Sequence, residues 1–235
     1  MPLAVITGAS RGLGLAVARE LVGRGWHLIV DARGGAALGR AMEGLGVPGQ
    51  VTEIQGDVAD PGHRQAIADA VDRAGSVALL VNNASVLGPS PQPRLERYPL
   101  AELEEVFRVN TIAPLALIQA LLPALHAAGG TIVNVTSDAA VEAYEGWGGY
   151  GASKAALEQL TAVLGAEQKT LRVYSFDPGD MRTAMHQEAY PGQDISDRPE
   201  PESVVPSLLR LIEERPRSGR YTSIELARVS EGVSP

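Results

Sequence analysis

A tyrosine and a lysine with a spacing suited to proton transfer stand in the second half of the chain. Tyr150 and Lys154 lie four residues apart in a segment, 150–168, that the pattern predicts to be a helix, so both side chains project from one helix face. A free phenol has a pKa of about 10, and a nearby ammonium group favours its charged form. The pair can therefore serve as a general acid and base near neutral pH. The same spacing also occurs on inert helices, so evidence from other parts of the chain is needed to show whether this pair is catalytic.

A glycine-rich segment near the N-terminus has the composition of a phosphate-binding turn. The apolar run 3–6 leads directly into Gly8, Gly12 and Gly14, and an apolar periodic segment, 15–22, follows. Glycines permit a tight turn and a close approach of backbone N–H groups to a ligand, and the start of a helix suits a pyrophosphate group. Glycine-rich turns are common after strands, but a dinucleotide site requires this position between strand and helix. The spacing Gly-x-x-x-Gly-x-Gly therefore indicates such a site here.

Apolar runs alternate with helical patterns along the chain. Strands are expected at 3–6, 26–30, 51–55, 77–81, 131–135 and 171–176, with a short strand near 221–224. Helices are expected between them, including one over about 100–128 that Pro114 and Pro123 kink or break, and a last one at about 203–214. This alternation predicts an α/β fold, a doubly wound parallel sheet of the Rossmann type, in a single domain over 1–235.

Polar residues follow the predicted strands where each of them ends. Ligands of such sheets bind outside the carboxyl ends of the strands. Those ends carry, in chain order, the glycine turn, 31–33, Asp57-Val58, 82–85, Ser137 and Pro178-Gly179. One extended ligand across the sheet edge would account for all of them, whereas loop residues are polar in many proteins for simpler reasons.

Together these motifs resemble the short-chain dehydrogenase/reductase family, in its branch of single-domain enzymes of roughly 250 residues. The matching motifs, which stand in the family's order, are Thr7-Gly8-x-x-x-Gly12-x-Gly14, Asn82-Asn83-Ala84, Ser137 and Tyr150-x-x-x-Lys154. The thirteen-residue step from Ser137 to Tyr150 is also usual for the family. The match covers about Leu3 to Thr183, and the part after Thr183 matches only loosely. Ser85 departs from the pattern, because many relatives carry a glycine there.

The resemblance implies a role for each catalytic residue. Tyr150 would exchange a proton with the substrate oxygen, and Ser137 would hydrogen-bond that oxygen. Lys154 would lower the pKa of Tyr150 and bind the ribose next to the nicotinamide. Asn110 matches a helix asparagine that holds a water in a proton relay to the lysine, although a buried asparagine can also be purely structural. The hydride would come from the cofactor, so the protein contributes positioning and proton transfer.

The resemblance also implies a set of cofactor-binding residues along the strand ends. Asp57 and Val58 would flank the adenine, and Asn83 with Ala84 would pass along the adenosine ribose. The complete expected set is Gly8, Ser10, Arg11, Gly12, Leu13, Gly14, Arg33, Asp57, Val58, Asn83, Ala84, Tyr150, Lys154, Pro178, Gly179, Met181 and Thr183. The last four of these would cradle the nicotinamide amide.

The choice between the two nicotinamide cofactors depends on the end of the second strand. An acidic residue there often binds the ribose 2′-OH of NAD, whereas an arginine accommodates the 2′-phosphate of NADP. Asp31 could be that acid, but the family's discriminating acid stands one place later, where this chain has Ala32. Arg33 and Arg11 both suit a phosphate, although Arg33 could equally be a solvated surface charge. The sequence favours NADP(H) and leaves NAD(H) open.

The substrate side of the site is expected between Ser137 and Tyr150 and in a lid at 183–202. Candidate lining residues are Val141, Ala143, Tyr144 and Trp147, with Met185, His186 and Tyr190 from the lid; ordinary loop packing is the alternative for each. A mixed apolar and aromatic cleft favours a neutral carbonyl compound or secondary alcohol. The leading hypothesis is therefore an NADP(H)-dependent carbonyl reductase or alcohol dehydrogenase.

Two other classes compete with this hypothesis. One is a lyase of the halohydrin dehalogenase type. Such lyases have a Ser-Tyr-Arg arrangement and a disrupted glycine turn, and they use no nicotinamide. The other is a non-catalytic nucleotide sensor of the kind that has lost the tyrosine or the lysine. Lys154, Tyr150 and the intact turn argue against both.

Composition narrows the remaining possibilities. The 235 residues have a net charge of −8, which disfavours nucleic-acid and anionic membrane surfaces, and no cysteine, which excludes disulfides and thiolate chemistry. The four histidines have no metal-ligand spacing. No run is expected to span a bilayer and the first strand leaves no room for a signal peptide, so a cytoplasmic protein is expected. The resemblance implies a homodimer or homotetramer formed through the helices around 100–128 and 150–168.

Overall fold

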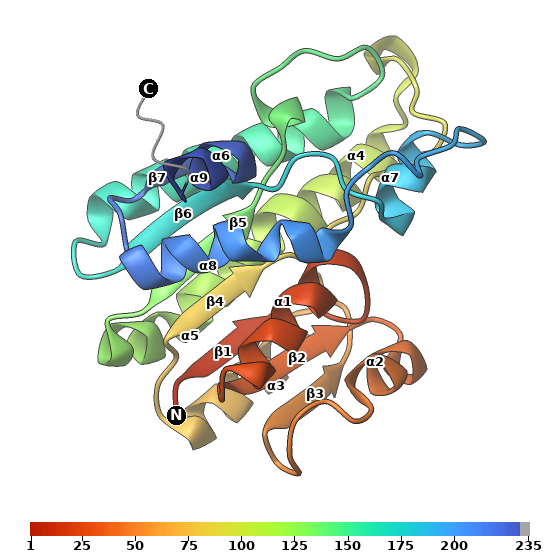
Figure 1. Cartoon of the computed structure of the whole chain (residues 1–235). Coiled ribbons are helices and arrows are strands. Elements are labelled where there is room, and N and C mark those ends of the chain that lie inside the picture. Colours follow the sequence, from red (N-terminus) through yellow and green to blue (C-terminus); the bar gives the residue numbers. More distant parts are fainter. Residues whose placement is uncertain (231–235) are drawn as a thin grey trace.

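A seven-stranded parallel sheet forms the centre of the computed structural model, which describes residues 1–230 (Figure 1). The strands lie in the order β3-β2-β1-β4-β5-β6-β7. Their bounds are β1 Leu3–Ile6, β2 His27–Ala32, β3 Val51–Gln55, β4 Leu79–Asn82, β5 Thr131–Val135, β6 Arg172–Asp177 and β7 Gly219–Thr222. The chain reverses its direction of progress across the sheet between β1 and β4, and such a switch point opens a crevice at the carboxyl ends of the strands. The predicted Rossmann-type sheet is confirmed; the last five residues of the predicted domain lie outside the described residues.

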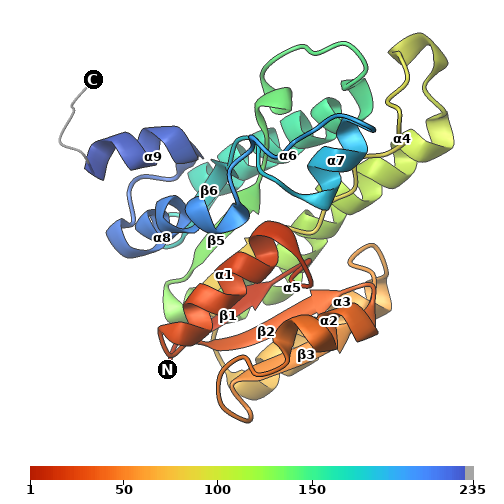
Figure 2. The same ribbon diagram turned by 45° about the vertical axis from the view of Figure 1, so that its right-hand side comes forward.

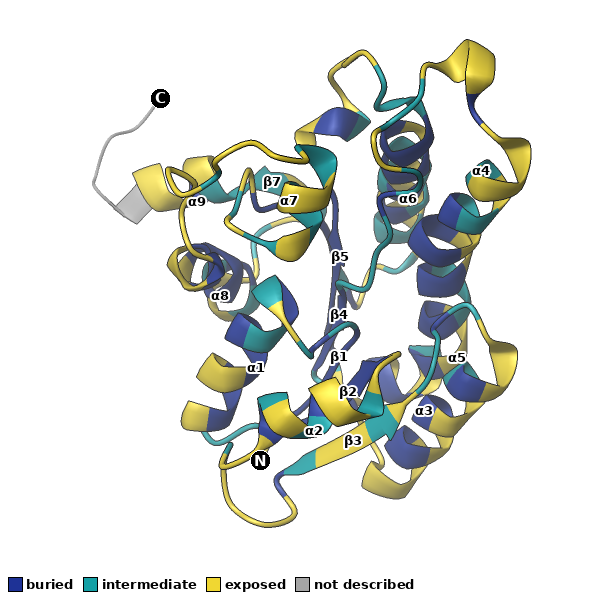
Figure 3. Ribbon diagram, turned by 90° about the vertical axis from the view of Figure 1, so that its right-hand side faces the viewer, coloured by how far each residue is buried: buried dark blue, intermediate teal, exposed yellow. Residues whose placement is uncertain are grey.

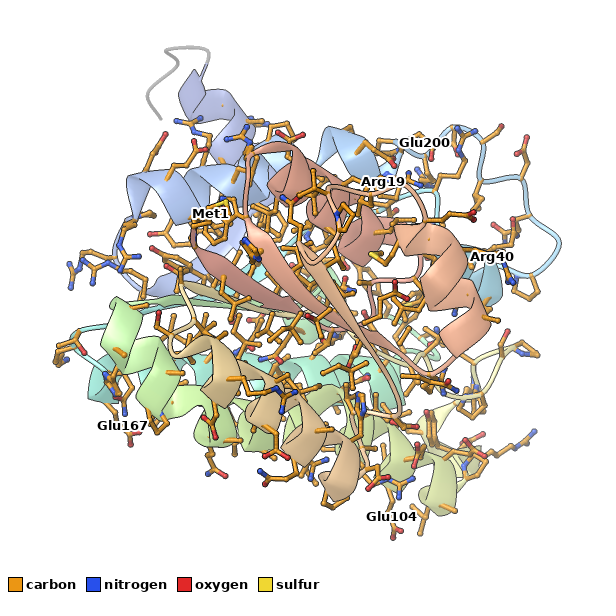
Figure 4. The ribbon with its side chains drawn as sticks, turned by 90° about the horizontal axis from the view of Figure 1, so that it is seen from below. Met1, Arg19, Arg40, Glu104, Glu167 and Glu200 are labelled. Atoms are coloured by element: carbon orange, nitrogen blue, oxygen red, sulfur yellow. The ribbon has the colours of Figure 1, made fainter. Side chains whose placement is uncertain are left out.

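Helices cover both faces of this sheet (Figure 3). One face carries α1 Gly12–Gly23, α2 Gly35–Met42 and α8 Val205–Glu214, and the other carries α3 Pro61–Ala74 and α5 Ala113–Ala128. The remaining helices are α4 Leu100–Phe107, α6 Gly148–Glu167, α7 Ala184–Ala189 and α9 Ser223–Ser230, with short turns η1 Leu95–Arg97, η2 Arg108–Ile112, η3 Asp138–Ala140 and η4 Pro201–Ser203. The labelled charged residues Arg40, Glu104 and Glu167 are all exposed at the outer surfaces of these helices (Figure 4).

Alternation along each strand divides the core into two halves. In β1, Ala4 and Ile6 pack with α1 and α8, whereas Val5 packs with α3 and α5. Strands buried on both faces need apolar side chains at successive positions, which is why they read as uninterrupted apolar runs. Each large side chain removed from water contributes about 1.5–3 kcal/mol, so the two halves hold the strand ends, and the polar residues beyond them, in fixed positions.

Several boundaries differ from the sequence-based expectations. The helix expected over 100–128 is divided into α4, the π-helical turn η2 and α5. Pro114 lies in the first turn of α5, directly after η2, and Pro123 lies inside α5 without ending it. The strand expected to end near 224 stops at Thr222, because Thr222 and Glu225 form a capping box that starts α9.

The helical stretch Leu100–Ala128 corrects the expectation that no segment is long and apolar enough to span a bilayer. By length and hydropathy it passes that test, as the only such helix among residues 1–230. However, Leu117, Leu121 and Leu125 are buried against the sheet and against α3. Core helices of α/β proteins have this composition because one of their faces is fully covered.

Candidate active site

A cavity of about 690 Å³ runs along the carboxyl ends of the strands. The predicted site residues that line it are Gly8, Ser10, Arg11, Gly12, Leu13, Arg33, Asp57, Val58, Asn83, Ala84, Ser137, Tyr150, Lys154, Pro178, Gly179, Met181 and Thr183. Gly14 and Asn110 do not line it. The fold therefore brings residues from the ends of β1 to β6 to one continuous wall, as one extended ligand would require.

The glycine turn has the geometry of an anion site. Gly8 and Gly12 have φ angles of +69° and +57°, a conformation that favours glycine. Helix α1 begins at Gly12 with no side-chain capping hydrogen bond and no acidic residue in its first turn. Its first N–H groups and the positive end of its dipole therefore remain available to a negatively charged group. These features fit the pyrophosphate of a dinucleotide.

Gly14 lies in α1 and packs against the glycine turn on the side away from the cavity. A Cβ atom on this residue would lie 2.6 Å from both Asn83 Nδ2 and Gly8 O, which are part of the turn itself. Because Asn83 Nδ2 donates to the carbonyls of Thr7 and Gly8, it has no freedom to move away. The third glycine thus permits α1 to pack directly against the turn.

The Gly14→Ala variant should bind a dinucleotide at least about tenfold more weakly and unfold at a lower temperature, since overpacking costs about 1–3 kcal/mol. Titration with NADPH and thermal melts measure both effects. Gly23→Ala, in the same helix with no atom within 4 Å of the added Cβ, provides the matched control. Equal affinity in the Gly14 and Gly23 variants would contradict this explanation of the turn.

Asp31 supports the turn as well. Its Oδ1 accepts the Gly8 N–H at 2.7 Å, and its Oδ2 lies 2.9 Å from His63 Nε2. Burial raises the pKa of Asp31, while the hydrogen bonds from His63 and Gly8 act in the opposite direction. Both carboxylate oxygens are therefore engaged by the protein, and the side chain is only 2% exposed. No sequence motif indicates this pair, because His63 follows Asp31 by 32 residues.

The ends of β1 and β4 are joined through Thr7. Its Oγ1 accepts the backbone N–H groups of Asn83 and Ala84, both at 3.0 Å. The Asn83 amide donates back to the Thr7 carbonyl at 2.9 Å. The side-chain amide group of Asn83 is therefore used to join β4 to the glycine turn. A ligand in the cavity can contact only the other atoms of this residue.

Tyr150, Ser137 and Lys154 converge at the centre of the cavity. Tyr150 lies near the start of α6, and the phenol is placed beside the hydroxyls of Ser137 and Ser85. Lys154, one turn further along α6, has its Nζ 5.5 Å from the centre of the Tyr150 ring and donates to Val135 O at 2.8 Å. Ser137 follows β5 and caps η3. The helix and the strand end thus deliver all three groups to one point.

Burial dominates the ionisation of this cluster. It raises the pKa of Tyr150 above its ordinary value, against smaller opposing effects of the Ser85 and Ser137 hydroxyls. It also lowers the pKa of Lys154 to about 8. Burial outweighs every effect that lowers the pKa of Tyr150 here, and a lowering of that pKa by Lys154 stays a prediction. Tyr150 keeps its proton at neutral pH, as a proton donor must.

Asn110 is completely buried in the π-helical turn η2, and π-helical turns are frequent at functional sites. Its Oδ1 accepts from Ser85 Oγ and from the Val86 N–H, and its Nδ2 donates to Val86 O and to Ser153 Oγ. An amide side chain has two donor hydrogens and two acceptor lone pairs, so this one is fully used. A role of Asn110 in a water relay would have to pass through its backbone carbonyl.

The predicted substrate-side residues fall into two groups. Tyr144, Trp147, Met185, His186 and Tyr190 line the cavity. Val141 and Ala143 do not, because they lie in an exposed turn after η3, and that part of the prediction is wrong. Helix α7 lies beside the start of α6 (Figure 2), where Met185 and Ala189 pack against the cluster of Leu87, Ala139 and Tyr150.

Sequence reasoning missed two residues of this site. Ser85 bridges Asn110 and the phenol of Tyr150, with a Ser85 Oγ–Asn110 Oδ1 distance of 3.0 Å. Asp138 accepts the hydroxyl of Ser137 at 2.8 Å and that of Tyr144 at 2.9 Å. Ser85 had a signal, its departure from the usual glycine, whereas the contact of Asp138 with Tyr144 depends on the path of the loop between them.

Comparison with known proteins agrees with this geometry. Residues 2–194 match the model of a protein family described as short chain dehydrogenase. The chain is 33% identical to the sepiapterin reductase of Mus musculus over 199 residues, which are 79% of this chain and 76% of that protein.

Solved structures show the same likeness. A short chain dehydrogenase from Pseudomonas syringae has a TM-score of 0.88 and 29% identity, covering 94% of this chain and 93% of that one. A short chain dehydrogenase from Escherichia coli CFT073, solved in complex with NADPH, has a TM-score of 0.87 and 27% identity, covering 94% of this chain and 96% of that one. This chain therefore belongs to the short-chain dehydrogenase/reductase family of enzymes.

Proposed function

We propose that this enzyme is an NADP(H)-dependent oxidoreductase that transfers a hydride between nicotinamide and a carbonyl compound or secondary alcohol. The observation that carries the proposal is the convergence of Tyr150, Ser137 and Lys154 on one cavity that begins at an uncapped helix N-terminus. The bound cofactor supplies the hydride. Tyr150 donates its proton to the substrate oxygen in reduction, and Ser137 positions that oxygen.

Lys154 contributes charge and orientation in this scheme. Its Nζ is held by Val135 O on one side and lies near the Tyr150 ring on the other, where it can bind ribose hydroxyls. An ammonium group beside the phenol stabilises the negative charge that develops on Tyr150 as the proton leaves. Reduction is favoured below pH 8, where both Lys154 and Tyr150 carry their protons.

Residues at the end of β2 and in the glycine turn support NADP(H) over NAD(H). Arg11 and Arg33 are exposed side chains on the cavity wall, available to a 2′-phosphate. Asp31, the acid that could bind a 2′-hydroxyl, is occupied by Gly8 and His63. Only 2% of the Asp31 surface is exposed, so little of its carboxylate is accessible to a ribose hydroxyl. The relative from Escherichia coli that was solved with NADPH supports the same choice.

Paired titrations with NADPH and NADH, followed by nicotinamide fluorescence, test this proposal. Much tighter binding of NADPH is expected. Preference for NADH would assign the ribose to Asp31 and overturn the phosphate-clamp assignment. Binding of neither cofactor would contradict the proposed activity and return the lyase and the nucleotide sensor to consideration.

Arg33→Ser should raise the Kd for NADPH by about 10- to 100-fold, the effect of losing one or more charge-assisted hydrogen bonds. The Kd for NADH should stay within about twofold, because NADH lacks the phosphate. Arg40→Ser, an exposed arginine on α2 outside the cavity, is the matched control. An unchanged NADPH affinity in Arg33→Ser would mean that this arginine is only a surface charge.

We also propose that the enzyme works in the cytoplasm as a homodimer or homotetramer. The apolar side chains of Leu100, Ile112 and Val163 are exposed on α4, η2 and α6, the helices expected to meet in such an assembly. Exposed apolar residues of this kind suit a subunit contact. Light scattering in solution tests the assembly, and a monomer at all concentrations would contradict it.

A further inference from the structure

Asp138, an exposed residue, places beside the reaction centre a negative charge that forms no ion pair within the described residues. Three donors hold its carboxylate: Ser137 Oγ and Ala139 N lie 2.8 Å from Oδ1, and Tyr144 Oη lies 2.9 Å from Oδ2. All three donors are neutral. Among the described residues 1–230, no lysine, arginine or histidine forms an ion pair with Asp138. The carboxylate thus has a fixed position and a charge that the protein leaves unpaired.

Two other carboxylates on the cavity wall, those of Asp177 and Asp180, have arginine partners. Asp177 pairs with Arg220 at 2.7 Å, and Asp180 lies 3.6 Å from Arg198 and 3.7 Å from His186. Asp138 itself lines the cavity, together with Tyr144, Trp147 and Tyr150. A cleft with charge of one sign attracts ligands of the opposite sign. This part of the cavity therefore favours a cation and disfavours an anion.

Aromatic rings form the wall around this charge. The Trp147 ring centre lies 5.8 Å from that of Tyr150, 6.0 Å from that of Tyr190 and 6.4 Å from that of Tyr144. Aromatic faces bind flat apolar groups and also attract cations. Both features of the wall agree with a ligand that combines an apolar body with a positive charge.

We infer that the preferred substrate is a carbonyl compound with an aromatic or apolar body and an ammonium or other positively charged N–H group close to the carbonyl. The N–H group would bind Asp138 while Ser137 and Tyr150 hold the oxygen. The separation must be short, because the Asp138 carboxylate lies 2.8 Å from the Ser137 hydroxyl. This inference rests on the proposed reductase activity and replaces the neutral carbonyl compound expected from the sequence with a positively charged one.

The arrangement also links substrate binding to Ser137. A serine hydroxyl has one hydrogen to donate, and Ser137 gives it to Asp138. A substrate N–H group that binds Oδ1 competes for the same lone pairs. The Ser137 hydroxyl can then rotate and donate its hydrogen to the carbonyl oxygen. A substrate without such a group has to displace the Ser137–Asp138 hydrogen bond unaided.

Three ketones of similar size and different charge test the inference: aminomethyl, ethyl and carboxyethyl phenyl ketone, each with NADPH. The wild-type kcat/KM should be highest for the ammonium ketone and lowest for the carboxylate. In Asp138→Asn, the ratio of the ammonium to the ethyl ketone should fall about tenfold, and the wild-type ratio should fall with added salt. Comparing ratios between variants cancels the intrinsic reactivity of each ketone and any general loss of activity.

Asp197→Asn is the matched control, since it removes one negative charge from an exposed residue outside the cavity. Its ratios should equal those of the wild type. An unchanged ratio in Asp138→Asn, a wild-type preference for the carboxylate, or reduction of none of the three ketones by a protein that binds NADPH would overturn the inference. Failure of the proposed activity itself would be distinguishable, because the protein would then bind no NADPH or leave it unoxidised with every carbonyl compound, and not only with these three ketones.

Discussion

Tyr150→Phe should lose about 10²- to 10⁴-fold in kcat for carbonyl reduction, the range typical of removing a general acid. The substitution deletes one oxygen atom from a residue whose ring packs against Leu87 and Ala139, and the ring itself stays in place. Binding of NADPH and the melting temperature should therefore change little. Steady-state kinetics together with a cofactor titration measure the loss and show that it lies in the chemical step.

Tyr190→Phe is the appropriate control, because it removes the same atom from the same cavity. It should reduce kcat by less than about tenfold, as expected for a residue that contributes packing rather than proton transfer. Turnover of Tyr150→Phe near the wild-type rate would exclude Tyr150 as the proton donor. A loss of NADPH binding in this variant would instead point to a structural role for the phenol.

Lys154→Met should lower kcat/KM by about 10²-fold or more, because the ammonium both orients the cofactor ribose and stabilises charge on the phenol. Methionine has a similar length and suits a buried position, so the fold should be retained. Lys169→Met, the same change at an exposed lysine, should leave activity unchanged. Equal activity of the two variants would contradict the assigned role.

The pH dependence provides a second readout for Lys154. Its pKa of about 8 means that the ammonium is present below that pH and is lost as the pH rises through it. The wild-type rate of carbonyl reduction should therefore decline above pH 8. The Met variant has no charge to lose there, so its lower activity should no longer show this decline. A decline of the same size in both proteins would assign it to another group.

The sheet and the wall of the cavity could be predicted because they depend on local patterns. Apolar runs marked the central strands, such as β1 and β4, and Gly8, Gly12 and Tyr150 stood at fixed places relative to the strands. Once parallel strands are in order, their carboxyl ends meet at one edge. The residues that follow each strand then share a cavity, as most of the predicted ones do.

The interactions that tune the site could not be predicted, because they join residues far apart in sequence. His63 reaches Asp31 across the base of the glycine turn, and Asn110 reaches both Ser85 and Ser153. The ionisation of Tyr150 and Lys154 also depends on burial, which spacing on a helix does not reveal. In contrast, the capping box formed by Thr222 and Glu225 is a local sequence motif. It could have predicted the start of α9, which the sequence-based expectations lack.

Direct hydride transfer requires the cavity to bring a carbonyl carbon of the substrate to the nicotinamide. Reduction with NADPH that carries deuterium at the transferable ring position, followed by mass spectrometry of the alcohol, tests this claim most directly. One deuterium is expected on the carbinol carbon, and Tyr150→Phe should form that product far more slowly. An alcohol without deuterium, or NADPH that stays unoxidised with every carbonyl compound tried, would contradict it.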